Sequence, residues 1–417
     1  MHFENLLTDA FWSVLGSGLS RVMMLVVSII LARILSQNDY GQLGIIKSTV
    51  NMFVVFAGFG IGNTTSRYIS LYKKKNIIEA RRIFDVSFAF IFFIAIIISL
   101  SVFVFAKQIS ILSFNDVALY EELRVSSFLL FFATVNGAYT GGLAGFQDFK
   151  SMARNTFYAS FIQAVLTILG GFYYGVIGAL IGSGIGYIFL FILHKKTLSN
   201  NFGKIKREIR LKDIFSTDKS FLWSFGIPAA LSSFLVSPVF WCTKSFLIRN
   251  SSFAEMALFD AADQWRIIVL FVPSALIPIV LPALMDNIKN FKKTLNFNIK
   301  LNFVITLTIL TPLFFFSDSI LGLYGDEYVN TKLFVVLISS ALFSSISSVV
   351  GSAIASLGIM WTGFLFNLFW AIYMVTLSIL FINLSMGAIG LAYAVFLSYV
   401  IHATVQFVFL KLKVKNI

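Results

Sequence analysis

The chain has 417 residues, of which 58% are hydrophobic and only 12% are charged, and its mean hydropathy is +0.88. A soluble protein of this length carries about 25% charged residues, and the 48 phenylalanines would leave large apolar patches on a globular surface. This composition excludes a soluble enzyme, a disordered chain and a fibre, and it predicts an integral membrane protein.

The apolar residues form continuous runs rather than an alternating pattern, which favours membrane-spanning helices over a β-barrel. The runs predict an all-α protein with twelve transmembrane helices. In chain order the predicted spans are residues 10–32, 43–66, 84–106, 123–145, 155–173, 175–193, 221–247, 257–284, 301–317, 331–356, 361–382 and 387–410. Two runs, 155–193 and 361–410, are too long for one helix and are divided at residues 173–175 and 383–387. Because the N-terminus has no basic cluster and Arg21 lies at the centre of the first run, we expect no cleavable signal peptide.

The distribution of basic residues predicts the orientation of the chain. An even number of spans puts both termini on one side, and that side holds 23 Lys and Arg residues against five on the other. Both termini are therefore expected in the cytoplasm. The net charge of +13 follows mostly from this topology, so no nucleic-acid partner is expected.

An internal repeat divides the chain into two halves. A shift of 216 residues aligns Arg33 with Arg249 and Asp39 with Glu255, and a shift of 212 aligns Asn155 with Asn367, Gly175 with Gly387 and Tyr187 with Tyr399. Each half has six spans, so the copies enter the membrane in the same direction and are expected to be related by an axis along the membrane normal. This predicts an N-terminal six-helix bundle at 1–193, a C-terminal six-helix bundle at 221–417, and a central cavity between them. The basic cytoplasmic linker at 194–220 is either solvated or forms a surface helix from Lys204 to Phe215.

Four basic residues lie inside predicted spans, on the same pair of spans in each half: Arg21, Lys47, Lys244 and Arg266. A charged side chain at the bilayer centre costs roughly 2.5–3.5 kcal/mol. These residues are therefore expected to face protein or a water-filled cavity, although Lys47 and Lys244 could instead snorkel to the membrane interface. Arg21 is mid-span with no carboxylate within a turn of it, which favours an anion-facing role.

Polar residues at helical spacing accompany these charges. The residues expected to line the cavity are Ser17, Asn51, Ser237, Trp241 and Gln264. On the eighth span Asp263 lies three residues before Arg266, with Asp260 one turn earlier. The two aspartates are candidates either for ion coupling or for charge pairing with the neighbouring cations.

All six prolines lie in the second half of the chain. An interior proline removes a backbone hydrogen bond and tends to kink a helix. We expect spans 7 and 8 to bend during transport at the hinge residues Pro228, Pro238, Pro273 and Pro278. Static kinks that shape the cavity are the alternative.

The sequence lacks several motifs that other functions require. It has no phosphate-binding loop of the GxxxxGK[ST] kind, which argues against direct use of ATP. No His, Cys or carboxylate cluster has metal-ligand spacing, and Cys242 is the single cysteine. No predicted exterior loop has room for a catalytic domain. We therefore expect no metal, no cofactor and no enzymatic activity.

Three segments resemble those of a known group of transporters. The segment from Ser28 to Gly44, SIILARILSQNDYGQLG, resembles the span 1 to span 2 signature of bacterial polysaccharide exporters. Phe59-Gly60-Ile61 with Arg67-Tyr68 is similar to the end of their second span, and residues 387–392, GAIGLA, resemble the start of their last span. The chain as a whole resembles the Wzx-type O-antigen and capsule flippases of the multidrug/oligosaccharidyl-lipid/polysaccharide exporter superfamily.

The resemblance implies a substrate, a direction and a location. The substrate would be an undecaprenyl-pyrophosphate-linked oligosaccharide repeat unit, moved from the cytoplasmic to the outer leaflet of the bacterial inner membrane by alternating access. Arg21, Lys47, Lys244 and Arg266 would then bind the pyrophosphate. Membrane lipid and a polysaccharide polymerase complex are implied partners, and H⁺, Na⁺ or the membrane potential is the implied source of coupling.

Two alternatives stay open. A cation-coupled multidrug antiporter of the same superfamily would need intramembrane carboxylates, for which only Asp260 and Asp263 are available. A membrane polysaccharide polymerase or ligase acting on the same lipid carrier is disfavoured by the short exterior loops.

Overall fold

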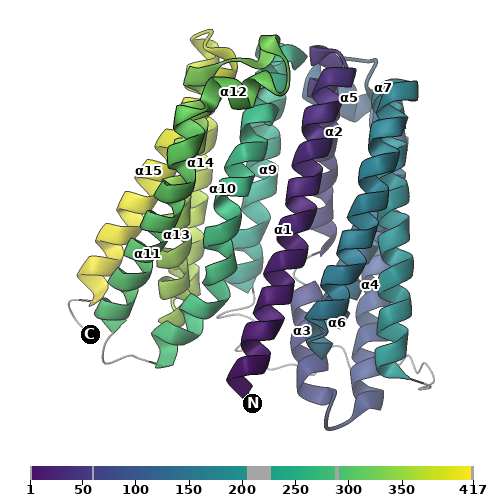
Figure 1. Ribbon diagram of the computed structural model, residues 1–417, viewed down its shortest axis with the longest axis vertical. Coiled ribbons are helices and arrows are strands. Elements are labelled where there is room, and N and C mark those ends of the chain that lie inside the picture. The colour runs from purple at the N-terminus through teal and green to yellow at the C-terminus, as the bar shows by residue number, and fades with distance from the viewer. Residues whose placement is uncertain (1, 59–60, 204–226, 287–290, 415–417) are drawn as a thin grey trace. The chain divides into compact units, whose positions relative to one another are not determined.

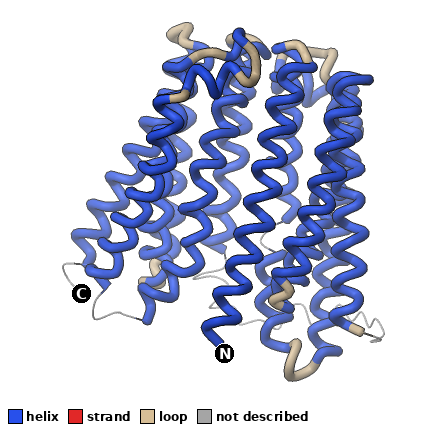
Figure 2. Tube along the Cα trace, viewed as in Figure 1, coloured by secondary structure: helices blue, strands red, loops and turns tan. Residues whose placement is uncertain are grey.

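The computed structural model describes residues 2–58, 61–203, 227–286 and 291–414. Within these ranges every regular element is a helix and no strand occurs, as Figure 2 shows. Eight of the described helices are long and apolar enough to cross a membrane by length and composition. The expected all-helical membrane fold is confirmed.

The chain divides into two compact units. Unit 1 comprises residues 1–35 and 46–217, and unit 2 comprises residues 36–45 and 218–417. The first turns of the second helix thus belong with the C-terminal part of the chain. Residues 204–226, which include most of the expected linker, lie outside the described ranges.

Unit 1 is built from seven helices among the described residues (Figure 1): α1 (His2–Ile34), most of α2 (Gln37–Gly58), α3 (Ile61–Tyr72), α4 (Ile77–Val104), α5 (Ala106–Phe114), α6 (Tyr120–Phe146) and α7 (Phe149–Phe202). The helix α6 packs against α3, α4 and α7, and α1 packs against α7. The span predicted at 43–66 is divided between α2 and α3. The span predicted from residue 84 begins at Ile77, because the helix continues through charged residues that a hydropathy criterion excludes.

The helix α7 folds back on itself at the predicted break. Tyr174 and Gly175 have non-helical backbone angles, and Gly175 has a φ of 58°. The two halves then run so close together that a Cβ on Gly178 would lie 2.0 Å from the carbonyl oxygen of Gly170. The hydroxyls of Thr167 and Ser183, 3.0 Å apart, join the same halves. Because Gly170 and Gly178 have no side chains, the backbones of the two halves of α7 can contact each other directly.

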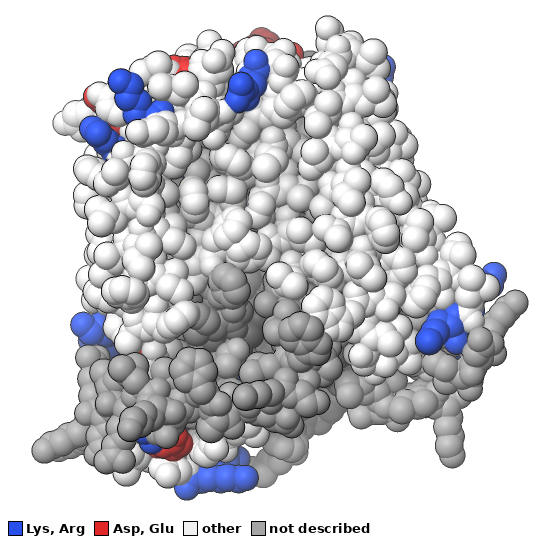
Figure 3. Space-filling view, turned by 180° about the vertical axis from the view of Figure 1, so that it is seen from behind, with Lys and Arg blue, Asp and Glu red and all other residues white. Residues whose placement is uncertain are grey.

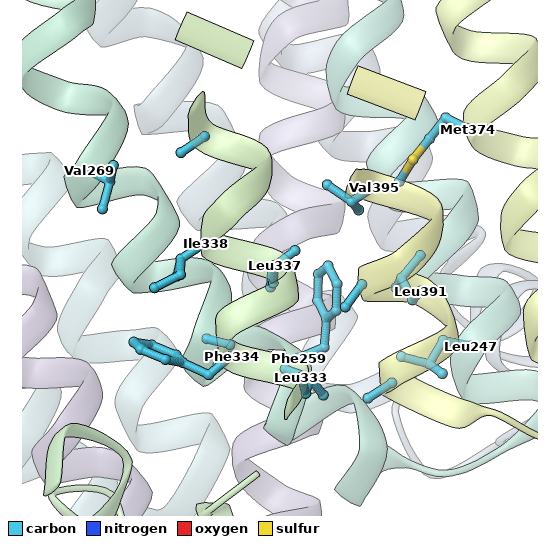
Figure 4. Packing of buried hydrophobic residues seen from close by; sticks show 14 of the residues in the cluster. Leu247, Phe259, Val269, Leu333, Phe334, Leu337, Ile338, Met374, Leu391 and Val395 are labelled. Carbon is cyan, nitrogen blue, oxygen red and sulfur yellow. The ribbon is translucent and has the colours of Figure 1, made fainter. Parts of the chain in front are cut away.

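Unit 2 contains the start of α2 and eight further elements among the described residues: α9 (Ile227–Asn250), α10 (Phe253–Asp286), α11 (Phe291–Phe315), α12 (Ser317–Gly322), the 3₁₀-helix η4 (Asp326–Tyr328), α13 (Thr331–Ser356), α14 (Met360–Asn383) and α15 (Gly387–Val414). Figure 4 shows its apolar core, to which α9, α10, α13, α14 and α15 contribute. Fully buried Phe259 and Phe334 lie in this cluster. The short helices α5 and α12 were not among the predicted elements.

The helix boundaries follow the repeat. The shift of 216 residues carries Ile34, the end of α1, onto Asn250, the end of α9, and carries Gln37, the start of α2, onto Phe253, the start of α10. The shift of 212 carries Gly175 onto Gly387, where φ is 55°. The two halves of the sequence therefore share one pattern of helix boundaries.

The charged side chains on the face in Figure 3 lie toward the top and bottom of the view, and the described atoms between them are uncharged. Large apolar side chains are exposed along the helices, including Phe93 on α4 and Phe128 on α6. Three consecutive exposed aromatic residues, Phe172, Tyr173 and Tyr174, lie at the break of α7. An apolar zone with aromatic residues at its edge is typical of a lipid-facing surface.

Glu255, in the first turn of α10, stabilises the start of α15. Its Oε2 accepts a hydrogen bond of 2.6 Å from the backbone N–H of Ala388. Because a carboxylate at a helix N-terminus satisfies an otherwise unpaired donor, Glu255→Ala is expected to lower the unfolding free energy of the purified protein by about 1 kcal/mol. Glu255→Gln, which keeps the acceptor, should lose less. A detergent unfolding titration that finds Glu255→Ala as stable as the parent would contradict this assignment.

Candidate functional site

Four charged side chains of unit 2 lie together, buried where α9 and α10 meet. Lys244 comes from α9, and Asp260, Asp263 and Arg266 come from α10. We call these four residues the charge cluster. Each is 5–8% exposed, so all four are withdrawn from the surface. Charged residues within apolar helices are expensive and mark functional sites in membrane proteins.

The charge cluster is a chain of alternating charges. Lys244 Nζ lies 3.3 Å from Asp260 Oδ1 and 3.4 Å from Asp263 Oδ2. Arg266 Nε donates to Asp263 Oδ1 at 2.6 Å. Asp263 therefore bridges both cations, with one oxygen to each. The two positive and two negative side chains balance formally.

Aromatic residues hold the arginine end of the charge cluster. The guanidinium carbon of Arg266 lies 5.0 Å from the ring centre of Phe240, a cation–π contact. Tyr399 on α15 lies close enough to Arg266 to interact with it electrostatically. Buried Trp370 packs against both Phe240 and Tyr399, with ring centres 6.1 Å and 5.4 Å apart. The guanidinium of Arg266 thus has neighbours on α9 and α15 as well as Asp263.

The aspartate end of the charge cluster is closed by the start of α2. A Cβ on Gly44 would lie 3.1 Å from the carboxyl carbon of Asp260. Gln264 Nε2 lies 3.5 Å from Asp260 Oδ2, at the limit of a hydrogen bond. Nearby, the ring of Tyr40 packs against those of Tyr324 and Tyr328, with centres 6.4 Å and 5.8 Å apart. This packing holds residues 36–45 in unit 2.

Tyr328 lies in the connection between α12 and α13. Burial raises the pKa of its hydroxyl, and the negative charges of Glu327 and Asp260 add to that rise. The hydroxyl therefore stays protonated at physiological pH. Tyr328 is therefore an uncharged neighbour of Asp260 in the charge cluster.

Helical spacing explains most of the charge cluster. Asp260, Asp263 and Arg266 are three residues apart on one helix and share a face. The structure has Asp263 paired with Arg266 and Lys244, which is the charge-pairing arrangement that the spacing allowed. Tyr399, Phe240 and Gly44 were not predicted. The repeat aligns Tyr399 with Tyr187, and Gly44 ends the segment that resembles the polysaccharide exporters, but neither signal pointed to the charge cluster.

The candidate residues of unit 1 lie on α1 and α2. Ser17 and Arg21 are exposed on α1, and no acidic residue follows Asp9 in that helix. Lys47 is half-buried and Asn51 is exposed on α2. Arg21 and Lys47 both have electrostatic or hydrogen-bonding interactions. Ser17 and Arg21, and likewise Lys47 and Asn51, are four residues apart and share a face of their helix.

The remaining candidates lie on α9 and α10. Ser237, Trp241 and Gln264 are half-buried. Pro238 is half-buried within α9 and Pro273 is buried within α10. The side chains of Pro228 and Pro278 lie outside the described residues. Both helices continue through the described prolines, and their role as hinges stays a prediction.

Within the described residues, no group of three or more His, Cys, Asp or Glu side chains could hold a metal ion. The two carboxylates of the charge cluster already accept from Lys244 and Arg266.

A twice-repeated array of long apolar helices with charges buried inside them is the architecture of a multi-pass membrane transporter. The chain belongs to the polysaccharide biosynthesis protein family, which matches residues 6–287. It is 24% identical over 405 residues to the EPS I polysaccharide export inner membrane protein EpsE of Ralstonia nicotianae, covering 91% of this chain and 89% of that protein. The resemblance to polysaccharide exporters is confirmed.

Two solved structures share the fold. The lipid II flippase MurJ in an inward closed conformation matches with a TM-score of 0.77 and 18% identity, over 96% of this chain and 87% of that chain. An inward-facing multidrug resistance MATE family transporter of the MOP superfamily matches with a TM-score of 0.74 and 16% identity, over 97% of this chain and 98% of that chain. At these identities the likeness shows the fold alone.

Proposed function

We propose that this protein is a flippase that moves undecaprenyl-pyrophosphate-linked oligosaccharide repeat units from the cytoplasmic to the outer leaflet of the inner membrane. The observation that carries the proposal is the similarity to a polysaccharide export protein over nearly the whole chain. The fold shared with the lipid II flippase MurJ adds support. Membrane lipid and a polysaccharide polymerase complex are the partners that we propose.

The chemistry of the headgroup explains the basic residues inside the helices. A pyrophosphate is a polyanion, and cations in a low-dielectric site lower the cost of carrying it across a bilayer. Arg21 and Arg266 are proposed to bind phosphate oxygens through their planar guanidinium groups, with Lys47 and Lys244 as point charges. Ser17, Asn51, Ser237, Trp241 and Gln264 are proposed to line the cationic cavity used for alternating access.

We propose the membrane potential as the driving force. With a negative cytoplasm, each headgroup charge that moves outward across 100 mV gains about 2.3 kcal/mol. Asp260 and Asp263 are engaged with Lys244 and Arg266, which favours charge pairing over H⁺ or Na⁺ coupling at these two positions. The excess of basic residues on one side supports cytoplasmic termini.

The multidrug antiporter is the second candidate, favoured by the fold shared with a MATE transporter. Such a protein would need carboxylates that can receive a cationic substrate. The two carboxylates of the charge cluster are already paired with Lys244 and Arg266, and the four intramembrane cations outnumber them. The flippase is therefore the better interpretation.

Arg21→Ala is expected to lower flipping at least about tenfold, the scale of one lost charge-assisted contact to phosphate. The measurement is the leaflet distribution of undecaprenyl-linked repeat units in cells that lack the gene and carry either the parent or the variant. Arg21→Lys, which keeps the charge but loses the planar fork, should be intermediate. Arg33→Ala, in the exposed last turn of the same helix, is the matched control and should leave flipping unchanged.

The same cells separate the alternatives. Repeat units that remain on the cytoplasmic leaflet without the gene support the flippase. Normal outer-leaflet delivery without the gene, in a strain with no second flippase, would favour the drug antiporter. Unpolymerised units accumulating outside would favour the polymerase.

A further inference from the structure

Both cations of the charge cluster are already paired with carboxylates of the same cluster. Asp263 contacts both Lys244 and Arg266, and Asp260 contacts Lys244 from the other side. A cation engaged in this way gives an incoming anion little net attraction. Yet a carrier of a pyrophosphate must offer positive charge at some stage of its cycle. One of the carboxylates must then leave its cation before an anion can bind there.

We infer that Asp263 is an internal competitor of the substrate, occupying Lys244 and Arg266 until the pyrophosphate takes its place. The inference rests on the proposed function and adds to it a residue that controls how tightly the headgroup binds. Asp263 acts through the two cations and is a positioning residue rather than a ligand of the substrate.

The contacts of Asp263 support an exchange of anions. Its two oxygens reach two different cations, Oδ1 to Arg266 Nε at 2.6 Å and Oδ2 to Lys244 Nζ at 3.4 Å. Two oxygens of a diphosphate can bridge the same pair of donors, since carboxylate and phosphate oxygens bind guanidinium and ammonium groups alike. Asp263 therefore occupies the arrangement that the headgroup would need.

The two cations are held in place by groups other than Asp263. Phe240 packs against the guanidinium of Arg266, and Tyr399 lies close enough to interact with it electrostatically. Lys244 Nζ lies 5.4 Å from the ring centre of Phe259 and also contacts Asp260. Withdrawal of the Asp263 carboxylate would therefore leave both donors near their present positions. The exchange requires movement of one short side chain rather than of the cations.

An internal competitor has a measurable consequence for binding and for transport. Removing its charge should make the anion bind more tightly, because nothing competes with it. The same change should slow delivery to the outer leaflet, because the carboxylate no longer helps to displace the bound headgroup. If Asp263 were a counter-ion that only stabilises the fold, removing its charge would not raise the affinity for the anion while lowering the rate of delivery to the outer leaflet.

The test is Asp263→Asn, with binding of inorganic pyrophosphate to the purified full-length protein measured by calorimetry. We expect affinity at least about tenfold higher than in the parent, the scale of one charged contact, together with slower flipping in the leaflet assay. Asp263→Glu, which keeps the charge, should restore affinity toward the parent value. The matched control is Asp85→Asn, which removes the carboxylate of another buried ion pair, with Arg81 at 3.0 Å, and should leave pyrophosphate affinity unchanged.

Unchanged or weaker pyrophosphate binding by folded Asp263→Asn would overturn the inference, as would an absence of binding in both parent and variant. If Asp263→Asn does not yield folded protein, Asp260→Asn provides the comparison. This substitution removes a carboxylate that contacts Lys244, whereas Asp263 contacts both Lys244 and Arg266. It should therefore raise the affinity for pyrophosphate by less than Asp263→Asn. Failure of the flippase proposal would instead show as normal leaflet delivery without the gene, whatever the binding results.

Discussion

Lys244→Met is expected to lower the unfolding free energy of the protein by roughly 3–5 kcal/mol, the range for removal of one partner from a buried ion pair. Lys244 contacts both Asp260 and Asp263, so its loss leaves two buried carboxylates with Arg266 as the one remaining cation of the charge cluster. Among the described side chains, Asp260 would keep its weak contact with Gln264. A detergent unfolding titration of purified protein measures the change.

A double substitution identifies the source of this loss. Lys244→Met with Asp260→Asn removes one charge of each sign and leaves the Asp263–Arg266 pair intact, so much of the stability should return. Arg249→Met, in the exposed last turn of the same helix, is the control and should change stability by less than about 1 kcal/mol. If the double variant is as unstable as Lys244→Met alone, buried uncompensated charge is not the cause.

Much of the fold could be predicted because lipid imposes simple rules on a chain. A helix satisfies its own backbone hydrogen bonds, so each apolar run long enough to span a bilayer predicts one. The break at Gly175 could be predicted because the run from 155 to 193 exceeds any single span. The starts of α4 at Ile77 and α11 at Phe291 were missed, since both helices continue past the apolar zone into charged sequence.

The candidate site was only partly predictable. The spacing of Asp263 and Arg266 on α10 depends on local helical geometry, which a sequence reveals. The contact of Lys244 with both aspartates depends on how α9 packs against α10, and no spacing rule supplies that. For the same reason the sequence did not show Phe240 beneath Arg266 or Gly44 against Asp260.

The four intramembrane cations lie on the first two helices of each repeat. In unit 2 the cations of α9 and α10 are balanced by carboxylates on α10. We therefore expect Lys244 and Arg266 to attract an anion only when Asp263 withdraws. For this reason Asp263→Asn should strengthen pyrophosphate binding, whereas Arg21→Ala removes a proposed phosphate ligand and should weaken it.

Gly178→Val is expected to destabilise unit 1 by roughly 3 kcal/mol or more, because overpacking against a rigid backbone cannot be relieved by a side-chain rotation. The first added carbon would lie 2.0 Å from the carbonyl oxygen of Gly170, and the same contact exists in reverse at Gly170. The two halves of α7 would have to separate, which would also break the bond between Thr167 and Ser183. Gly184→Val, in the same half of α7, is the matched control, since its nearest neighbour is Leu129 Cβ at 4.0 Å. Thermal unfolding of the purified variants decides the point, and equal losses for the two substitutions would indicate a general intolerance of valine in this helix rather than a close approach at Gly178.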